Sequence, residues 1–162
     1  MSTPGAGPRH QTTLTVLMTP DMANFAGNVH GGTILKFLDQ VAYACASRYA
    51  GRYVVTLSVD QVMFRQPIHV GELVTGFARV NYAGKTSMEV GVKIIAEHLI
   101  TGEKRHTNSC YVTYVALDDD GKPSAVPPIV PETPDEKRRY ERAAKRRASR
   151  VMERRYDQGR GE

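Results

Sequence analysis

The chain has 162 residues, of which 41% are hydrophobic and 24% charged, which suits one domain with a sizeable core and a modest appendage. Its formal net charge of +5 is uneven, because residues 1–134 hold 11 Lys and Arg against 11 Asp and Glu, whereas residues 135–162 hold 11 against 6. The neutral body argues against an extended phosphate-binding surface, so we expect no nucleic-acid partner.

The two cysteines, Cys45 and Cys110, lie inside apolar stretches and lack the spacing of a disulfide framework or a metal site. We therefore expect both to be reduced core residues. No signal peptide is evident, and no apolar run approaches the roughly 18 residues that a membrane span needs. These features predict a cytoplasmic protein with no membrane integration. No metal site is expected, because the histidines show no ligand spacing with cysteines or carboxylates.

The first expected elements are a strand and a long helix. Residues 1–10 carry Gly, Pro and Ser without periodicity, and we expect them to be disordered. Residues 12–18 are β-branched and apolar enough for a strand, and a turn and a long loop follow them. Residues 31–49 read as a helix with few polar positions, which Gly51 ends. An apolar surface on nearly every side predicts that this helix is buried.

Four more strands are expected after the helix, over 53–65, 72–82, 86–99 and 105–117. Their connections are short, which favours antiparallel neighbours. One apolar helix followed by a curled antiparallel sheet of about five strands packs most simply with the sheet wrapped round the helix. Residues 11–134 should therefore form an α+β domain that resembles the hotdog fold.

The end of the chain differs in composition from this domain. The segment from Asp118 to residue 134 has too many prolines for regular structure. Within the basic tail, 135–162, we expect a helix over 135–156 with Arg and Lys outside one narrow apolar stripe, formed by Tyr140, Ala144, Ala148 and Val151. A solvated helix that packs on a neighbouring subunit is favoured over a phosphate-binding or nucleic-acid-binding one, because no aromatic residues are interleaved for base stacking.

A polar segment directly before the long helix contains candidate catalytic residues. It begins at Asn24 and ends with Gly31 and Gly32, where the start of the helix offers unpaired N–H groups. Such amides can hold a thioester carbonyl oxygen as it becomes an oxyanion. Glycines before helices are also common as simple turns or for tight helix packing, and both interpretations remain open.

Asp39 lies two turns into the helix, with Phe37, Leu38 and Val41 nearby. A carboxylate in such surroundings is costly unless it is hydrogen-bonded or faces a wet cavity. It could act as a general base towards water or as a nucleophile that forms a short-lived anhydride. Alternatively, it could pair with a side chain across a subunit interface.

The combined motifs resemble one family over residues 12 to about 155. They are Asn24-x-x-Gly-Asn-Val-His-Gly-Gly32, Asp39, Val55-Thr-Leu-Ser-Val-Asp60, Gly84-Lys-Thr-Ser87 and Val112-Thr-Tyr-Val-Ala-Leu-Asp118. This combination resembles the cytosolic acyl-CoA hydrolases, which are hotdog-fold acyl-CoA thioesterases. It is closest to the amino-terminal repeat of the brain-type long-chain enzymes, and bacterial single-repeat relatives are also similar.

The resemblance implies a catalytic pair, Asn24 and Asp39, brought together from two hotdog units across a dimer interface. A homodimer would then form two equivalent sites, and a trimer of dimers is the expected assembly. Asn24 would orient water or the thioester, although it could instead cap its loop. The Gly31 and Gly32 amides would form the oxyanion site. His30 is expected beside the substrate rather than as the base.

Further residues are expected to contact acyl-CoA. The turn Gly84, Lys85, Thr86 and Ser87 offers amides, hydroxyls and a cation for pantetheine or phosphate groups, although a plain hairpin turn would use similar residues. Two arginines outside this turn, Arg65 and Arg105, are further candidates for binding the phosphate groups of coenzyme A. The acyl channel would be lined by Phe37, Val59 and Phe64, which could equally be ordinary core.

The predicted function is therefore hydrolysis of fatty acyl-CoA to free fatty acid and coenzyme A. Coenzyme A is part of substrate and product, and no separate cofactor is expected. Two alternatives stay open, a hotdog dehydratase or hydratase acting on acyl thioesters, and a non-catalytic acyl-CoA-binding protein.

Overall fold

The structure is a computed structural model that describes residues 9–159. Its strands pair antiparallel in one sheet with the order β1-β3-β4-β5-β2. The disorder predicted for residues 1–10 falls outside the described residues over positions 1–8. In chain order the elements are β1 (Gln11–Leu17), the short helix η1 (Pro20–Met22), α1 (Gly31–Ala50), β2 (Val54–Val59), β3 (Leu73–Ala83), β4 (Ser87–Glu97), β5 (Lys104–Ala116) and α2 (Pro134–Gly159).

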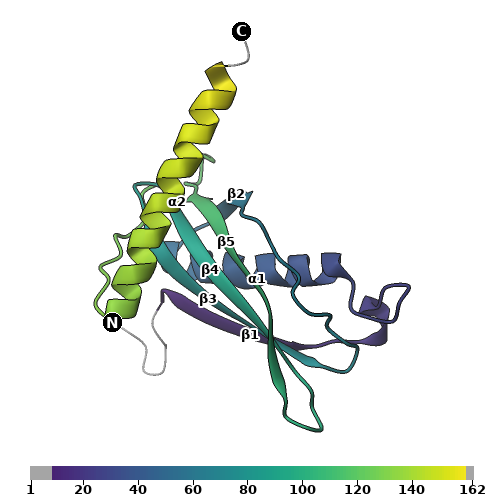
Figure 1. Ribbon diagram of the computed structural model, residues 1–162. Helices are drawn as coiled ribbons and strands as arrows, with labels where there is room; N and C mark the ends of the chain where they lie inside the picture. The colour runs from purple at the N-terminus through teal and green to yellow at the C-terminus, as the bar shows by residue number, and fades with distance from the viewer. Residues whose placement is uncertain (1–8, 160–162) are drawn as a thin grey trace.

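The sheet curls round α1, and α2 lies against the opposite face (Figure 1). This confirms the predicted α+β hotdog arrangement of five antiparallel strands and one central helix. Gly51 ends α1 with φ of 68°, a left-handed conformation that glycine adopts without strain. No helix within residues 9–159 is long and apolar enough to cross a membrane.

The strand predicted over 53–65 is wrong in length, because β2 ends at Val59. Beyond that point the chain still follows β5, but with separate hydrogen bonds instead of a continuous ladder. The Asp60 N–H donates to the Tyr111 carbonyl oxygen (2.9 Å), and the Arg65 N–H donates to that of Thr107 (3.1 Å). The six residues from Asp60 to Arg65 therefore lie opposite the five from Tyr111 to Thr107, so the segment holds one extra residue and bows away from the sheet.

The core lies between α1 and the concave face of the sheet. One side of α1 is fully buried there, and it comes very close to β3 at Gly76. A Cβ atom placed on Gly76 would lie 2.8 Å from Cγ2 of Val41 and 3.3 Å from Cε1 of Phe37. The helix can reach this depth only because position 76 has no side chain. The buried α1 residues are Ile34, Phe37, Leu38, Val41, Ala42, Cys45 and Ala46.

The prediction that α1 is buried on nearly every side is wrong for this single chain. Leu35 and Tyr43 are exposed on the face turned away from the sheet, and Asp39 lies between them on the same side. The neighbouring edge strand β2 also exposes Leu57 and Val59. The number of apolar residues in α1 overstated its burial. That number includes apolar side chains on the outer face of the helix as well as those that contact the core.

The tail helix α2 packs on its own sheet through charged residues. Glu89 is only 2% exposed, and its carboxylate accepts hydrogen bonds from Nε (3.1 Å) and Nη2 (2.6 Å) of Arg146. Arg150 reaches the same carboxylate (3.4 Å) and that of Asp60 (3.2 Å). The Arg146 guanidinium also lies 3.6 Å from the centre of the Tyr111 ring. Cations therefore share the packed face of the helix with Ala143 and with Tyr140, whose ring centre lies 5.0 Å from that of Tyr82.

This packing confirms the expected apolar stripe at Tyr140 and Ala144, which are partly buried, and corrects it further along the helix. Ala148 and Val151 are exposed, whereas Ala143 is fully buried and Arg146 faces the sheet. The physical reason is Glu89, because a carboxylate covered by a helix is stable only with cations beside it. The C-terminal part of α2 projects beyond the sheet (Figure 1), and residues 151–159 are all exposed.

Substitution of Gly76 by alanine should destabilise the protein by about 1–3 kcal/mol, because the added methyl forces α1 or β4 to shift. Urea denaturation followed by circular dichroism would measure the loss. Gly159→Ala is the control, since no atom lies within 4 Å of a Cβ at that position. Equal unfolding free energies for the two variants would contradict the account of close packing.

Substitution of Glu89 by glutamine should lower the free energy of unfolding by about 1–3 kcal/mol, because Arg146 and Arg150 lose the anion that they share. The same urea titration would measure this change. Glu103→Gln removes one carboxylate from an exposed turn and should have no effect. A loss in the control as large as in Glu89→Gln would show that net charge alone is responsible.

Candidate active site

The loop before α1 is organised by Asn24. Its Oδ1 accepts hydrogen bonds from the backbone N–H groups of Ala26 (2.9 Å) and Asn28 (3.1 Å). Its own N–H donates to the Asn28 carbonyl oxygen (2.6 Å). The capping role left open by the sequence is therefore present. Only Oδ1 is used in this way, and within residues 9–159 the Nδ2 group has no hydrogen-bond acceptor, so it can still donate to a ligand.

The start of α1 is capped by His30. Its Nδ1 accepts a hydrogen bond from the Gly32 N–H (3.2 Å), so this amide is already engaged in the ligand-free chain. The expected pair of oxyanion donors is thus reduced to one. The Gly31 N–H makes no hydrogen bond within the described residues. A Cβ placed on Gly31 would lie 3.7 Å from the Phe64 ring, so this glycine lies under an aromatic side chain.

An open cleft of about 240 Å³ lies at this helix start, and we call it the Asn24 cleft. It brings together four residues that the sequence analysis selected. Ile34 and Ile68 add an apolar wall. The cleft combines an amide side chain, a helix-start N–H and a cation at an apolar surface. The four selected residues are Asn24, Gly31, Phe64 and Arg65.

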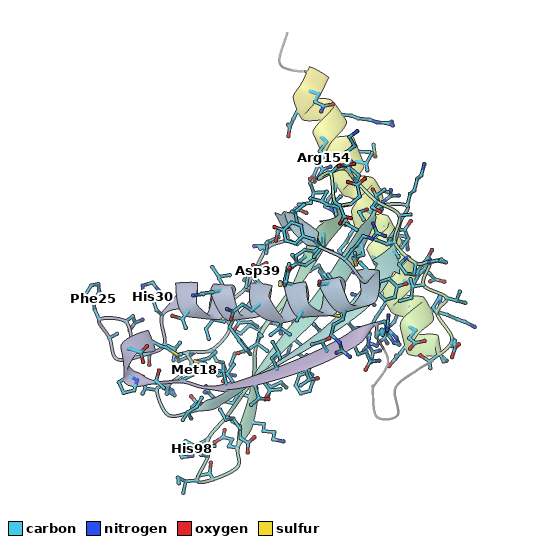
Figure 2. The ribbon with its side chains drawn as sticks, turned by 180° about the vertical axis from the view of Figure 1, so that it is seen from behind. Met18, Phe25, His30, Asp39, His98 and Arg154 are labelled. Carbon is cyan, nitrogen blue, oxygen red and sulfur yellow. The ribbon has the colours of Figure 1, made fainter. Side chains whose placement is uncertain are left out.

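Asp39 does not line the Asn24 cleft, and it lies eight residues beyond Gly31 on α1, which corresponds to about 12 Å along the helix axis. Figure 2 shows His30 at the start of the helix and Asp39 partway along it. Contrary to expectation, the Asp39 carboxylate is not enclosed, because the side of α1 that carries it is exposed. One chain therefore keeps Asn24 and Asp39 apart.

Two hydroxyl groups hold the Asp39 carboxylate from the sheet side. The Tyr114 hydroxyl donates to Oδ1 (2.9 Å), and the Thr56 hydroxyl donates to the same oxygen (3.4 Å). Tyr114 is fully buried under α1. Burial, together with the hydrogen bond and charge of Asp39, raises the pKa of Tyr114 above its usual value, so the phenol stays a donor. The second oxygen, Oδ2, makes no hydrogen bond within residues 9–159.

Sequence reasoning missed the roles of Thr56 and Tyr114. Both lie inside motifs that carried the family resemblance, but neither was singled out. Alternation along the strand predicted over 105–117 could have identified Tyr114, because it places this hydroxyl on the core side, where a polar group needs a partner. Thr56 has no comparable signal, since a threonine in an edge strand is ordinary.

The turn after β3 lies near Asp39 and away from the Asn24 cleft. Met88, one residue beyond the turn, is paired with Tyr114, which in turn is paired with Thr56. The turn backbone is largely occupied, because the Gly84 N–H donates to the Ser87 carbonyl oxygen (2.8 Å) and the Lys85 carbonyl oxygen accepts from the Val126 N–H (3.0 Å). The Thr86 carbonyl oxygen accepts from the Ala116 N–H (2.9 Å). The Lys85 side chain remains exposed.

Arg105 is not available for phosphate, contrary to expectation. Its Nη2 donates to both carboxylate oxygens of Glu72 (2.6 and 2.7 Å), and its Nη1 donates to the Pro67 carbonyl oxygen (2.9 Å). Burial alone would raise the pKa of Glu72, but the hydrogen bonds and charge of Arg105 outweigh it and lower the pKa. Arg105 therefore stabilises the turn that leads into β3.

The three residues expected in an acyl channel have different surroundings. Phe37 is 7% exposed and belongs to the core beside Gly76, which favours its alternative interpretation. Val59 and Phe64 are about half exposed and lie before and after the segment that bows away from β5. They leave an apolar surface that a ligand or a second chain can cover.

Comparisons with known proteins show the family of the chain. The thioesterase superfamily matches residues 26–102. Protein VdlD of Helicobacter pylori is 49% identical over 143 residues, which are 88% of this chain and 82% of that protein. The uncharacterized acyl-CoA thioester hydrolase YkhA of Bacillus subtilis is 38% identical over 135 residues, which are 83% of this chain and 78% of that protein. The cytosolic acyl coenzyme A thioester hydrolase of Mus musculus is 38% identical, covering 81% of this chain and 35% of the mouse protein.

Solved structures of other proteins are similar to this chain in both fold and sequence. A hexameric acyl-CoA thioesterase superposes with a TM-score of 0.85 at 38% identity, covering 90% of this chain and 93% of that one. The acyl-CoA hydrolase of Staphylococcus aureus, solved with butyryl coenzyme A and coenzyme A, has a TM-score of 0.81 at 33% identity, covering 95% and 96%. The chain therefore belongs to the acyl-CoA thioester hydrolase family of the thioesterase superfamily.

Proposed function

We propose that this protein hydrolyses fatty acyl-CoA to a free fatty acid and coenzyme A. The observation that carries the proposal is the Asp39 carboxylate, which Tyr114 and Thr56 hold through one oxygen while the other makes no hydrogen bond within residues 9–159. A general base needs this combination of a fixed position and a free lone pair. The relatives that are named as acyl-CoA hydrolases supply the substrate class.

The Staphylococcus aureus enzyme supports these positions. It has been solved with single alanine substitutions of an asparagine, an aspartate and a threonine. Along that chain the aspartate follows the asparagine by 15 residues, and the threonine follows the aspartate by 17. Asn24, Asp39 and Thr56 have the same two spacings here. We infer that these three residues occupy the corresponding positions.

The distance between Asn24 and Asp39 requires a second chain in the proposed site. Gly31, which lines the same cleft as Asn24, is about 12 Å from Asp39 along the helix, which is too far for groups that act on the same carbonyl. A two-fold dimer would place Asp39 of one chain at the Asn24 cleft of its partner, which gives two equivalent sites. The exposed side of α1 and the edge strand β2 offer apolar surface for this contact. Hexameric relatives support a trimer of such dimers.

In the proposed reaction Asp39 takes a proton from water as the water attacks the thioester carbonyl carbon. In the alternative route its carboxylate attacks that carbon first, and water then cleaves the anhydride. The Asn24 Nδ2 group and the Gly31 N–H would stabilise the negative oxygen. The C–S bond breaks, and coenzyme A leaves as its thiol after taking up a proton. These groups need no cofactor, and we propose a cytoplasmic enzyme.

The geometry favours hydrolysis over dehydration. A hotdog dehydratase would use the histidine before the helix as its base, but His30 Nδ1 is occupied as the acceptor for Gly32. His30 is also exposed at the rim of the loop (Figure 2). His30 is not among the described residues that line the Asn24 cleft, so its contact with the substrate stays a prediction from the sequence.

Asp39→Asn should lower kcat by about 10²–10⁴, because an amide cannot accept the proton from water. Thiol release from a series of acyl-CoA esters, short to long, would measure the effect with purified protein. Asp119→Asn, in an exposed turn, is the matched control and should keep full activity. Turnover by Asp39→Asn at the wild-type rate would refute the assignment. Tight acyl-CoA binding without any release by wild type would indicate a binding protein instead.

Mixed dimers would test the two-chain site. Asn24→Ala and Asp39→Asn should each be nearly inactive alone, but a dimer of one chain of each type has one site with both substitutions and one with neither. Co-expression with random pairing should therefore restore about a quarter of wild-type activity. The double variant Asn24→Ala with Asp39→Asn, co-expressed with itself, is the negative control. No recovery in dimers shown to be mixed would place both residues in one chain's site.

A further inference from the structure

Residues 60–65 connect the two faces of the sheet, and we call this segment the strap. It leaves β2 and runs along β5 towards the end of the sheet where α1 begins (Figure 1). The side chain of Asp60 contacts α2, which packs on one face of the sheet. The ring of Phe64 lies over Gly31 at the start of α1, on the other face. A contact made on one face can therefore influence the other through the strap.

The strap leads into one wall of the Asn24 cleft. That wall is formed by consecutive residues from Phe64 to Ile68, so the last two strap residues, Phe64 and Arg65, belong to it. The strap is not part of a continuous ladder, because between the backbone hydrogen bonds of Asp60 and Arg65 it bows away from β5. The position of this wall therefore depends on a few individual contacts.

The first of these contacts fixes the start of the strap to the tail helix. Nη1 of Arg150 lies 3.2 Å from Oδ2 of Asp60, and its Nη2 lies 3.4 Å from Oε2 of Glu89. The side chains of Arg150 and Asp60 are only 18% and 27% exposed, so solvent screens this ion pair less than one on the open surface. Glu89 is itself held by Arg146, which keeps Arg150 in place between two carboxylates.

The second contact holds the middle of the strap from inside the protein. Asn108 is fully buried, and its Nδ2 donates to the Met63 carbonyl oxygen (3.1 Å). Its Oδ1 is also buried and has no hydrogen-bond partner among the described residues. An apolar residue would avoid this unpaired oxygen, so the stability of the core does not account for an amide here. The hydrogen bond to the strap does account for it.

We propose that Asp60, Arg150 and Asn108 are positioning residues for substrate binding. They hold the strap so that Phe64 and Arg65 keep the Asn24 cleft in the shape that binds acyl-CoA. The tail helix thereby helps to determine substrate affinity, although it packs on the face of the sheet opposite α1. The inference rests on the proposed function for the identity of the substrate. None of the three residues is among the described residues that line the cleft, so they act through the strap.

Steady-state kinetics with a series of acyl-CoA esters would test this. Asp60→Asn and Arg150→Gln should each raise KM about threefold to tenfold and leave kcat within about twofold of wild type, because binding is weakened while Asp39 keeps its position. The double variant should be no worse than Arg150→Gln alone, since both substitutions break the same contact. Asp60→Glu keeps the carboxylate and should recover most of the affinity.

Asn108→Leu separates positioning from a purely structural role. Leucine branches at the same carbon as asparagine, and it removes the unpaired oxygen together with the contact to Met63. KM should therefore rise as in Asp60→Asn, while the urea midpoint of unfolding stays equal to that of wild type or increases. A lower midpoint with an unchanged KM would show that Asn108 serves the fold alone and would contradict the proposal.

The position of the strap can be measured without any reaction. The chain contains no tryptophan, so Phe64→Trp introduces a single fluorophore on the strap. The Phe64 side chain is half exposed, which leaves room for the larger indole. In this background Asp60→Asn should move the emission to longer wavelength and increase quenching by acrylamide, because the strap is less restrained. The matched controls are Asp119→Asn and Arg155→Gln, at exposed positions outside the strap, and they should change neither KM nor emission.

Several outcomes would overturn the proposal. It fails if the controls raise KM as much as Asp60→Asn, if the emission does not respond to Asp60→Asn, or if gel filtration shows that the higher KM follows dissociation of the assembly. An altered emission with an unaltered KM would also refute it. Absence of thiol release by wild type from every ester would refute the proposed hydrolysis instead. Emission and the Kd for coenzyme A, compared between wild type and Asp60→Asn, would then still decide whether the strap is held as proposed.

Discussion

The close approach of α1 to β3 is the constraint on which the rest of the structure depends. Gly76 lets the helix reach the floor of the curled sheet, and Val41 and Phe37 fill the space that a side chain there would occupy. At this depth the middle of the helix meets Tyr114, whose buried hydroxyl can then reach Asp39. A helix held higher by even one methyl group would separate these two groups. The packing of the core therefore also fixes the position of the Asp39 carboxylate.

Much of the fold could be predicted from the sequence. The period-2 pattern around Val90 and Val92 identified a strand with one face on the core, and Gly51 marked the helix end within one residue. The predictions were wrong where contacts with residues distant in the sequence determine the structure. The strand expected to reach Arg65 stops at Val59, since only hydrogen bonding to β5 determines where a ladder breaks. The stripe on the tail helix was wrong beyond Ala144 because a buried Glu89, on a distant strand, attracts arginines.

The candidate site, like the fold, could be predicted only in part from the sequence. Asn24, Gly31, Phe64 and Arg65 are gathered in one cleft, as expected of residues chosen for substrate binding or catalysis. The engagement of Gly32 by His30 and of Arg105 by Glu72 depends on side-chain contacts that no spacing rule contains. The even charge count of residues 1–134 also gave no sign that Arg79 and Lys93 lie beside cations of the tail helix, because these side chains meet only after folding.

The separation of Asp39 from the Asn24 cleft in one chain has a consequence for how such an enzyme behaves on dilution. The core of one chain is complete without a partner, since α1 and the sheet bury each other. On the proposed two-chain arrangement, a separated chain would be folded yet inert. Specific activity would then rise with protein concentration until dimers are fully formed, although spectroscopic measures of folding stay constant. Cellular abundance itself would act as a control on thioester turnover.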